Sequence, residues 1–368
     1  MKQLQQQQGF DASAAWQAAQ DGVALADRSH WGQLRLAGGD RLSFLHNQST
    51  NDLKALTPGQ GCETVFVTAT ARTIDLATAY VLEDSLRLLV SPSRREPLLK
   101  LLDRYIFFGD AVSLGDDQAA TACFSLIGPR SHSLITQLTG QDFSREPEHS
   151  HRSLALAPIP GPTSEPTSES TSAPIPVQLA NGSGLGLSGY TLFCPADRAL
   201  ELWVLLGERG AIALAPETWE QLRIRQGRPA PDQELTEDYN PLEAGLWQTI
   251  SFDKGCYIGQ ETIARLNTYN GVKTRLWGIQ LSAPAAPGSA ITLAGTKIGQ
   301  LTSLSETPEG LRGLGYIRTK AGGAGLKVQV GEAEALVLPL DYVSHPSDGK
   351  LDESVEDGQA NQGSLTSE

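Results

Sequence analysis

Short strands and helices alternate irregularly along this 368-residue chain, and this irregular order is what most constrains its fold. Alternating or β-branched runs predict strands at residues 64–68, 74–81 and 85–90, whereas apolar stripes predict helices at residues 10–19 and 93–105. No regular strand–helix–strand period is present. We therefore expect an α+β fold with a mostly antiparallel sheet instead of parallel α/β units.

Two segments have a composition unlike the rest of the chain. Residues 146–176 are rich in Pro, Ser and Thr and contain too few apolar side chains to offset their ordering entropy, so we expect a disordered insertion there. Residues 344–368 are acidic and lack aromatics, which predicts a disordered tail. Between them, short strands separated by Gly and Pro over residues 273–343 predict a small C-terminal β-barrel.

Charge and cysteine usage limit the class of protein. A formal net charge of −13 argues against direct, non-specific binding of nucleic acid, which usually needs a basic face. The four cysteines are widely separated and form no Cys-x-x-Cys pair, so neither a structural zinc site nor a dithiol redox site is indicated. The N-terminus lacks the apolar core of a secretory signal, and no apolar run is long enough to span a bilayer. We expect a cytoplasmic protein with no membrane partner.

Residues 254–261, which read Lys-Gly-Cys-Tyr-Ile-Gly-Gln-Glu, combine several reactive and hydrogen-bonding side chains with two glycines. Cys256 is the candidate functional thiol. Lys254, two residues before it, either favours the thiolate form of this cysteine or is an ordinary solvated surface lysine. Gly255 and Gly259 permit a tight turn or close approach to a ligand. The plain alternative is a buried structural cysteine, but the polar neighbours of this thiol are poor core material.

This segment carries a resemblance to a known family. Together with Asp27-Arg28-Ser29, residues 39–52 and Ile250-Ser251-Phe252-Asp253, it resembles the YgfZ family. These proteins are folate-binding relatives of the glycine-cleavage T-protein and are implicated in making or maintaining iron–sulfur enzymes. The resemblance covers residues 20–340 apart from the insertion. It implies a T-protein-like, folate-binding core of two α+β portions, residues 10–145 and 177–272, with the barrel closing over it.

The resemblance also implies tetrahydrofolate or a derivative as the ligand. Glu243, in a Glu-Ala-Gly context, and Asp75 would contact the pterin, with Arg72 beside them, although Ala71 replaces the glycine that the family keeps before this arginine. A carboxylate suits that task because its two oxygens can accept neighbouring N–H groups of a pterin edge. The alternatives are a solvated, helix-terminal Glu243 and an ordinary turn or sheet-edge acid at Asp75.

Other residues near the thiol have open roles. Tyr257 belongs to the signature loop, and Gln260 and Glu261 are expected to orient it by hydrogen bonds. Arg265 either meets the anionic glutamate tail of folate or pairs with Glu261. His46 is either a base that activates the thiol or, as we favour, a structural histidine near a helix.

From these residues we expect a folate-binding accessory protein that supports assembly or repair of iron–sulfur enzymes and affects tRNA modification only indirectly. A stable cluster ordinarily needs four ligands, so Cys256 would be at most a transient ligand shared with iron–sulfur client or assembly proteins, and no resident metal is expected. The alternative is a tetrahydrofolate-dependent aminomethyltransferase. The sequence Glu243-Ala244-Gly245 favours it, whereas the Lys-Gly-Cys signature argues against it.

Overall fold

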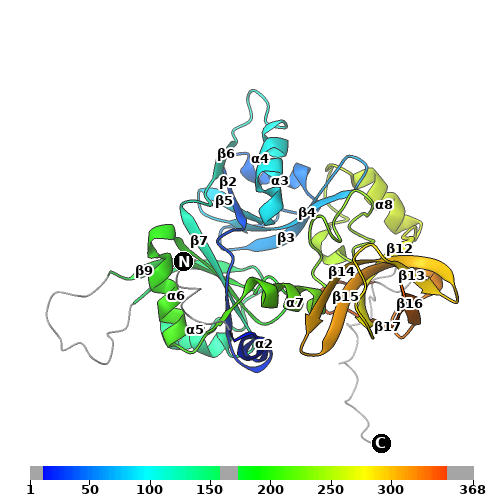
Figure 1. Ribbon diagram of the computed structural model, residues 1–368. Coiled ribbons are helices and arrows are strands. Elements are labelled where there is room, and N and C mark those ends of the chain that lie inside the picture. The colour runs from blue at the N-terminus through cyan, green and yellow to red at the C-terminus, as the bar shows by residue number, and fades with distance from the viewer. Residues whose placement is uncertain (1–10, 158–172, 346–368) are drawn as a thin grey trace, which may run out of the picture.

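The computed structural model describes residues 11–157 and 173–345. Their strands form a six-stranded sheet, a five-stranded sheet and a closed barrel, which are arranged around a common centre (Figure 1). Neighbouring strands are antiparallel with one exception, the pairing of β1 with β11. The expected α+β class and the C-terminal barrel are therefore confirmed.

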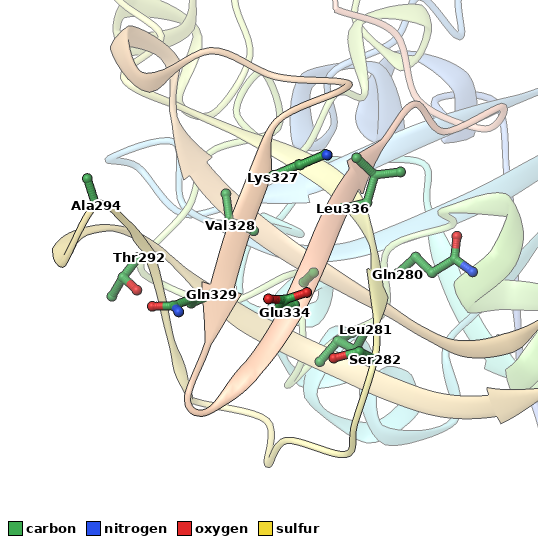
Figure 2. Close-up of a pocket in the computed structure, with 11 residues that line it drawn as sticks. Gln280, Leu281, Ser282, Thr292, Ala294, Lys327, Val328, Gln329, Glu334 and Leu336 are labelled. Carbon is green, nitrogen blue, oxygen red and sulfur yellow. The ribbon is translucent and has the colours of Figure 1, made fainter.

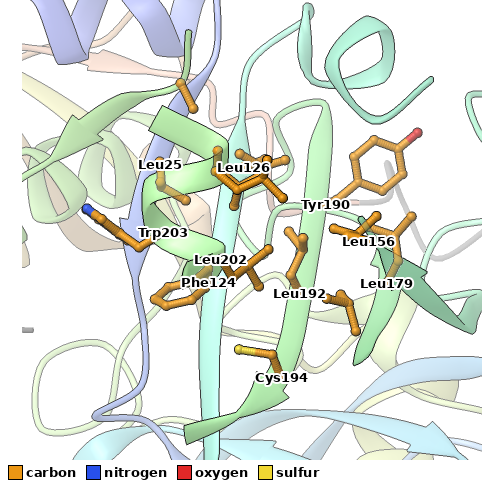
Figure 3. Packing of buried hydrophobic residues seen from close by; sticks show 14 of the residues in the cluster. Leu25, Phe124, Leu126, Leu156, Leu179, Tyr190, Leu192, Cys194, Leu202 and Trp203 are labelled. Carbon is orange, nitrogen blue, oxygen red and sulfur yellow. The ribbon is translucent and has the colours of Figure 1, made fainter. Parts of the chain in front are cut away.

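The six-stranded sheet has the order β11-β1-β7-β10-β9-β8. Its strands are β1 (Ala24–Asp27), β7 (Thr121–Ile127), β8 (His151–Leu156), β9 (Ile175–Asn181), β10 (Gly189–Pro195) and β11 (Ile212–Leu214). One face packs against α5 (Ser131–Thr139) and α6 (Ala199–Glu208) through a core that includes Phe124, Leu126 and Leu202 (Figure 3). Because side chains alternate along a strand, Cys123 and Ile127 belong to clusters on the opposite face. Helix α2 (Ala12–Asp21) contributes to that second face.

The five-stranded sheet has the order β3-β4-β5-β2-β6. Its strands are β2 (Gly32–Ala37), β3 (Gly61–Val67), β4 (Thr73–Val81), β5 (Ser85–Val90) and β6 (Ser113–Asp116). Leucines of its outer face pack against α3 (Arg41–Gln48) and α4 (Arg95–Asp103). On the inner face, Tyr80 meets Phe193 of the other sheet edge-to-face, with ring centroids 5.4 Å apart. The two sheets therefore share an aromatic contact at the centre of the molecule.

The barrel consists of β12 (Thr274–Leu281), β13 (Ala290–Leu293), β14 (Thr296–Thr307), β15 (Gly310–Arg318), β16 (Lys327–Val330) and β17 (Ala333–Leu338). It is joined to helix α7 (Pro216–Gln226) by a buried polar network around Glu234. Glu234 accepts hydrogen bonds from Arg223 of α7 at 2.9 Å and from Thr302 of β14 at 2.7 Å. This network fixes the barrel against the core because Arg223, Glu234 and Thr302 are buried or half-buried and paired.

The remaining helix, α8 (Gln260–Thr268), follows the signature motif, and short 3₁₀ turns span Pro92–Arg94, Ala196–Arg198, Trp247–Thr249 and Thr319–Ala321. Within the two described stretches of the chain, no helix is both long and apolar enough to cross a bilayer.

The sheets do not follow the expected division at residues 145 and 177. After β1, the chain forms the five-stranded sheet and then returns to the six-stranded sheet with β7. There β7, from the first expected portion, pairs with β10, from the second. The ends of the expected insertion at 146–176 are also strands, since β8 pairs with β9. The disorder predicted for its middle and for most of the 344–368 tail falls on residues 158–172 and 346–368, outside the described residues.

Candidate functional site

Lys254 anchors the signature loop to helix α3. Its side chain is only 6% exposed, and its ammonium donates to the carbonyls of His46, Ser49 and Asn51 at 2.6, 2.7 and 2.6 Å. These carbonyls belong to the end of α3 and the turn after it, where helical carbonyls lack partners. Burial lowers the pKa of Lys254 to about 8, while the charge of Asp52 acts in the opposite direction.

Cys256 lies two residues after this anchor and is exposed. In the described part of the chain, no hydrogen bond joins its thiol to Lys254 or to His46. The imidazole of His46 is instead buried, with Nδ1 3.0 Å from Asp52 Oδ1, and burial lowers its pKa. The geometry therefore agrees with a structural His46 and gives Lys254 an anchoring role that the sequence did not predict.

Gly259 starts helix α8 with a φ of +82° and has little free space around it. A Cβ atom there would lie 2.8 Å from Val67 and 3.2 Å from the Cα of Ala71, so the loop approaches the β3–β4 turn closely. Ala71 itself adopts φ +60°, a left-handed conformation that glycine takes at lower cost. A Cβ atom at Gly255, by contrast, would meet nothing within 4 Å, and this residue has no positive φ.

Of the other signature residues, Tyr257 and Gln260 contact Lys254, whereas Glu261, which was expected to orient the loop, pairs instead within helix α8. Tyr257 is buried, with its ring 4.7 Å from the Lys254 ammonium, and burial raises its pKa to about 12. Gln260 Nε2 donates to the Lys254 carbonyl at 3.4 Å. Glu261 and Arg265 form an exposed ion pair of 2.6 Å on α8, which is the simpler of the two roles expected for Arg265.

A central cavity of about 360 Å³ lies where the two sheets and α7 meet. Trp31 and Trp219 line it with their ring centroids 6.2 Å apart and their planes at 76°. Two almost fully buried arginines, Arg28 and Arg228, also line it, as does Ser91 at the end of β5. The cavity therefore combines flat aromatic walls with buried cations, a pattern suited to a planar ligand that carries an acidic group.

Asp75 of β4 lies behind this wall and is fully buried. The backbone N–H of Ser91 donates to its Oδ2 at 3.0 Å, while Oδ1 has no hydrogen-bond partner among the described residues. Burial raises the pKa of Asp75 to about 6, although the Ser91 hydrogen bond and the charge of Arg228 act in the opposite direction. Of the predicted ligand residues, this carboxyl is the one the fold brings to the edge of the cavity.

Glu243 and Arg72 do not line the central cavity. The Glu243 carboxylate accepts the backbone N–H of Asn240 at 3.1 Å and so closes the turn before the barrel; burial raises its pKa. Arg72 donates to the carbonyl of Asp238 at 2.8 Å. Arg72 therefore connects the β3–β4 turn to the segment at Asp238, whereas Glu243 bonds within its own turn, and the structure does not bring either side chain together with Asp75 at one site.

A larger cavity of about 770 Å³ lies on the barrel, between residues of β12, β13, β16 and β17 (Figure 2). Its ionisable lining residues are Lys327 and Glu334, and none of the predicted site residues is among them. In the described stretches, no group of three or more His, Cys, Asp or Glu side chains could hold a metal ion. None of the predicted site residues lines the central cavity either, but its buried arginines and paired tryptophans set it apart, so we take it and the exposed Cys256 loop as the candidate site.

Sequence reasoning missed the cavity residues Trp219, Arg228 and the role of Arg28. Arg28 stands in one of the segments that carry the family resemblance, but nothing in its spacing indicates burial. Arg228 lies two residues after the end of α7 at Gln226, in a polar stretch typical of a surface loop. Only the packing of α7 against the sheets buries these residues.

Residues 5–254 match the sequence profile of the GCVT N-terminal domain. The chain belongs to this family. A chloroplastic Arabidopsis thaliana protein named as a candidate transferase is 42% identical over 337 residues, which cover 90% of this chain and 74% of that protein. An aminomethyltransferase of Geobacillus thermodenitrificans is 28% identical over 334 residues and 87% of each chain.

The crystal structure of the glycine cleavage system aminomethyltransferase T from Bartonella henselae has the same fold. It superimposes with a TM-score of 0.73 over 90% of this chain and 89% of that one, at 18% identity. The GCVT-family architecture of this chain is thus shown both by sequence and by structure.

Proposed function

We propose that this GCVT-family protein is a folate-binding accessory factor of the YgfZ type, which supports the assembly or repair of iron–sulfur enzymes. The observation that carries the proposal is the exposed Cys256 thiol, presented on a loop that the buried Lys254 fastens to the core. Because this thiol is not in the lining of the central cavity, a macromolecular partner can reach it while a small molecule occupies the cavity. An effect on tRNA modification would follow from a client enzyme.

The cavity residues fit a reduced folate. The half-buried Trp219 provides a face for the p-aminobenzoyl ring, because the Arg28 guanidinium already covers the Trp31 ring at 3.9 Å. Asp75, with its unpaired Oδ1, is the proposed acceptor for the N–H donors of the pterin; it lies behind Ser91 and not in the cavity lining. Tetrahydrofolate supplies a carrier for a one-carbon unit when bound. The chain's own residues would hold and orient it and keep water from the ring.

Direct titration tests the folate part of the proposal. We expect saturable binding of 5-formyltetrahydrofolate, and about a tenfold loss of affinity, or roughly 1.4 kcal/mol, when the cavity-lining Trp219 is replaced by leucine. Trp277→Leu is the matched control, because this tryptophan packs on His345 beside the barrel. Calorimetry measures both; equal binding by the two variants would place the ligand elsewhere.

A complementation experiment tests the role of the thiol. In cells lacking the protein, Cys256→Ser should fail to restore the activity of iron–sulfur enzymes, although its free energy of unfolding stays within about 0.5 kcal/mol because the side chain is exposed. Cys62→Ser, a change at a half-buried thiol, is the control that should still complement. Full restoration by Cys256→Ser would remove the thiol from the function.

An aminomethyltransferase activity is the second candidate. It is favoured by the similarity to aminomethyltransferases over most of both chains. A glycine-cleavage assay with lipoylated carrier protein distinguishes the two. Turnover that survives Cys256→Ser would favour the transferase, whereas no turnover in a protein that binds folate would favour the accessory factor.

A further inference from the structure

Two buried arginines at the central cavity have neutral partners. Arg28 and Arg228 are each 2% exposed. Arg28 donates to the hydroxyl of Ser125 at 3.2 Å, and Arg228 donates to the carbonyl of Leu76 at 3.4 Å. The Nε of each guanidinium has no hydrogen-bond partner among the described residues. Each guanidinium therefore has hydrogen-bonding capacity that the described residues leave unused, and both side chains line the cavity.

A third arginine of the same cavity serves as an internal comparison. Arg223 forms ion pairs with Glu220 at 2.6 Å and with Glu234 at 2.9 Å. Neither Arg28 nor Arg228 forms an ion pair within the described part of the chain. Asp75 interacts with the charge of Arg228, but its hydrogen bond goes to the Ser91 backbone. Burying a charge without a partner costs several kcal/mol, so this arrangement is poorly balanced without a further anion.

The surroundings hold the two guanidiniums in place next to the cavity. The Cζ of Arg28 lies 3.9 Å from the centre of the Trp31 ring and 5.0 Å from that of Trp219, and the Cζ of Arg228 lies 5.2 Å from the centre of Trp31. Both cations are thus steadied by the same indole. Gly184 leaves room for Arg28, since a Cβ there would lie 2.6 Å from its Nη1.

We propose that Arg28 and Arg228 jointly bind a carboxylate of the cavity's ligand and so select ligands that carry an acidic group. The choice of a folate carboxylate rests on the proposed function, because the glutamate tail supplies the carboxylates of a reduced folate. A planar guanidinium fork matches a carboxylate in geometry as well as charge. In this arrangement the tail is held inside the molecule, and the exposed Arg265 on α8 has no part in binding it.

Calorimetric titration with three probes tests this inference: 5-formyltetrahydrofolate, p-aminobenzoylglutamate, and 5-formyltetrahydrofolate with both glutamate carboxylates converted to amides. The first two should bind the wild-type protein, and the diamide at least 30-fold more weakly than its parent. Arg28→Met and Arg228→Met should each weaken the first two probes at least 30-fold. Arg318→Met, a change at an exposed arginine of the barrel, is the matched control and should bind them normally.

A stability measurement separates ligand binding from a structural role. Without ligand, Arg28→Met and Arg228→Met should unfold at the same temperature as the wild type or higher, because each removes a buried, unpaired charge. A structural role predicts a lower unfolding temperature instead. If either variant fails to fold, that outcome counts against the proposal, and the diamide titration on wild-type protein tests it independently.

The outcomes for the anion site and for folate binding differ. If 5-formyltetrahydrofolate binds but the diamide and both variants bind equally well, the two arginines do not select the ligand and the proposed function stands. If the folate does not bind, but p-aminobenzoylglutamate binds in an arginine-dependent way, the anion site stands and the folate assignment fails. If none of the probes binds, both are overturned.

Discussion

Replacing Lys254 with methionine is expected to lower the free energy of unfolding by about 3–5 kcal/mol. The ammonium satisfies three carbonyls at 2.6–2.7 Å, and methionine keeps most of the side-chain volume while removing every donor. Each buried acceptor then loses its partner at a helix end that offers no replacement from the helix. Urea denaturation of the variant and the wild type measures the difference.

The matched control is Lys100→Met, because the Lys100 side chain is 75% exposed and its closest carboxylate, that of Glu96, is 4.0 Å away. That change should alter stability by less than about 0.5 kcal/mol. Loosening the anchor should also speed hydrogen exchange of the loop around Cys256, whereas Lys100→Met should not. A Lys254→Met protein as stable as the control would show that water replaces the ammonium and that the anchor is dispensable.

Replacing Asp75 with asparagine should stabilise the protein at neutral pH by about 3 kcal/mol. The pKa of this carboxyl is raised from 3.8 to about 6 by burial, and one pKa unit corresponds to about 1.4 kcal/mol. Between these two values the folded state binds more protons than the unfolded state, so raising the pH destabilises the wild type. Asparagine keeps an acceptor for the Ser91 N–H and removes the charge.

The pH dependence is the decisive measurement. The difference in free energy of unfolding between Asp75→Asn and the wild type should be small near pH 4. It should grow as the pH rises through about 6 and should then level off. Asp253→Asn, a change at an exposed aspartate in the signature region, is the matched control and should leave the free energy of unfolding within about 0.5 kcal/mol of the wild type. A wild type that instead gains stability over this range would mean that Asp75 has a strong cationic partner when folded. A stabilising Asp75→Asn would indicate that the native carboxylate is kept for its ligand.

Periodicity and composition predicted where the strands and helices lie better than they predicted which strands pair. The β-branched run at 64–68 falls largely in β3, the strand expected at 85–90 is β5, and the strands separated by Gly and Pro form the barrel. The division at 145 and 177 did not match the sheets, because alternation shows which residues are buried but not which strand pairs with which. The pairing of β7 with β1 joins segments far apart in the sequence, and no local sequence pattern indicates it.

The sequence by itself determined the α+β class, the barrel and which residues form the signature motif, since these depend on local pattern and on a short motif. Only the tertiary structure decided the roles of the charged residues. The acceptors of Lys254 lie 203 to 208 positions earlier in the chain, and the cavity takes Arg28 from one end of the core and Arg228 from the other. A charged side chain contributes little to stability on the surface, but it needs a partner when it is buried. Whether it is buried depends on which distant segments pack together.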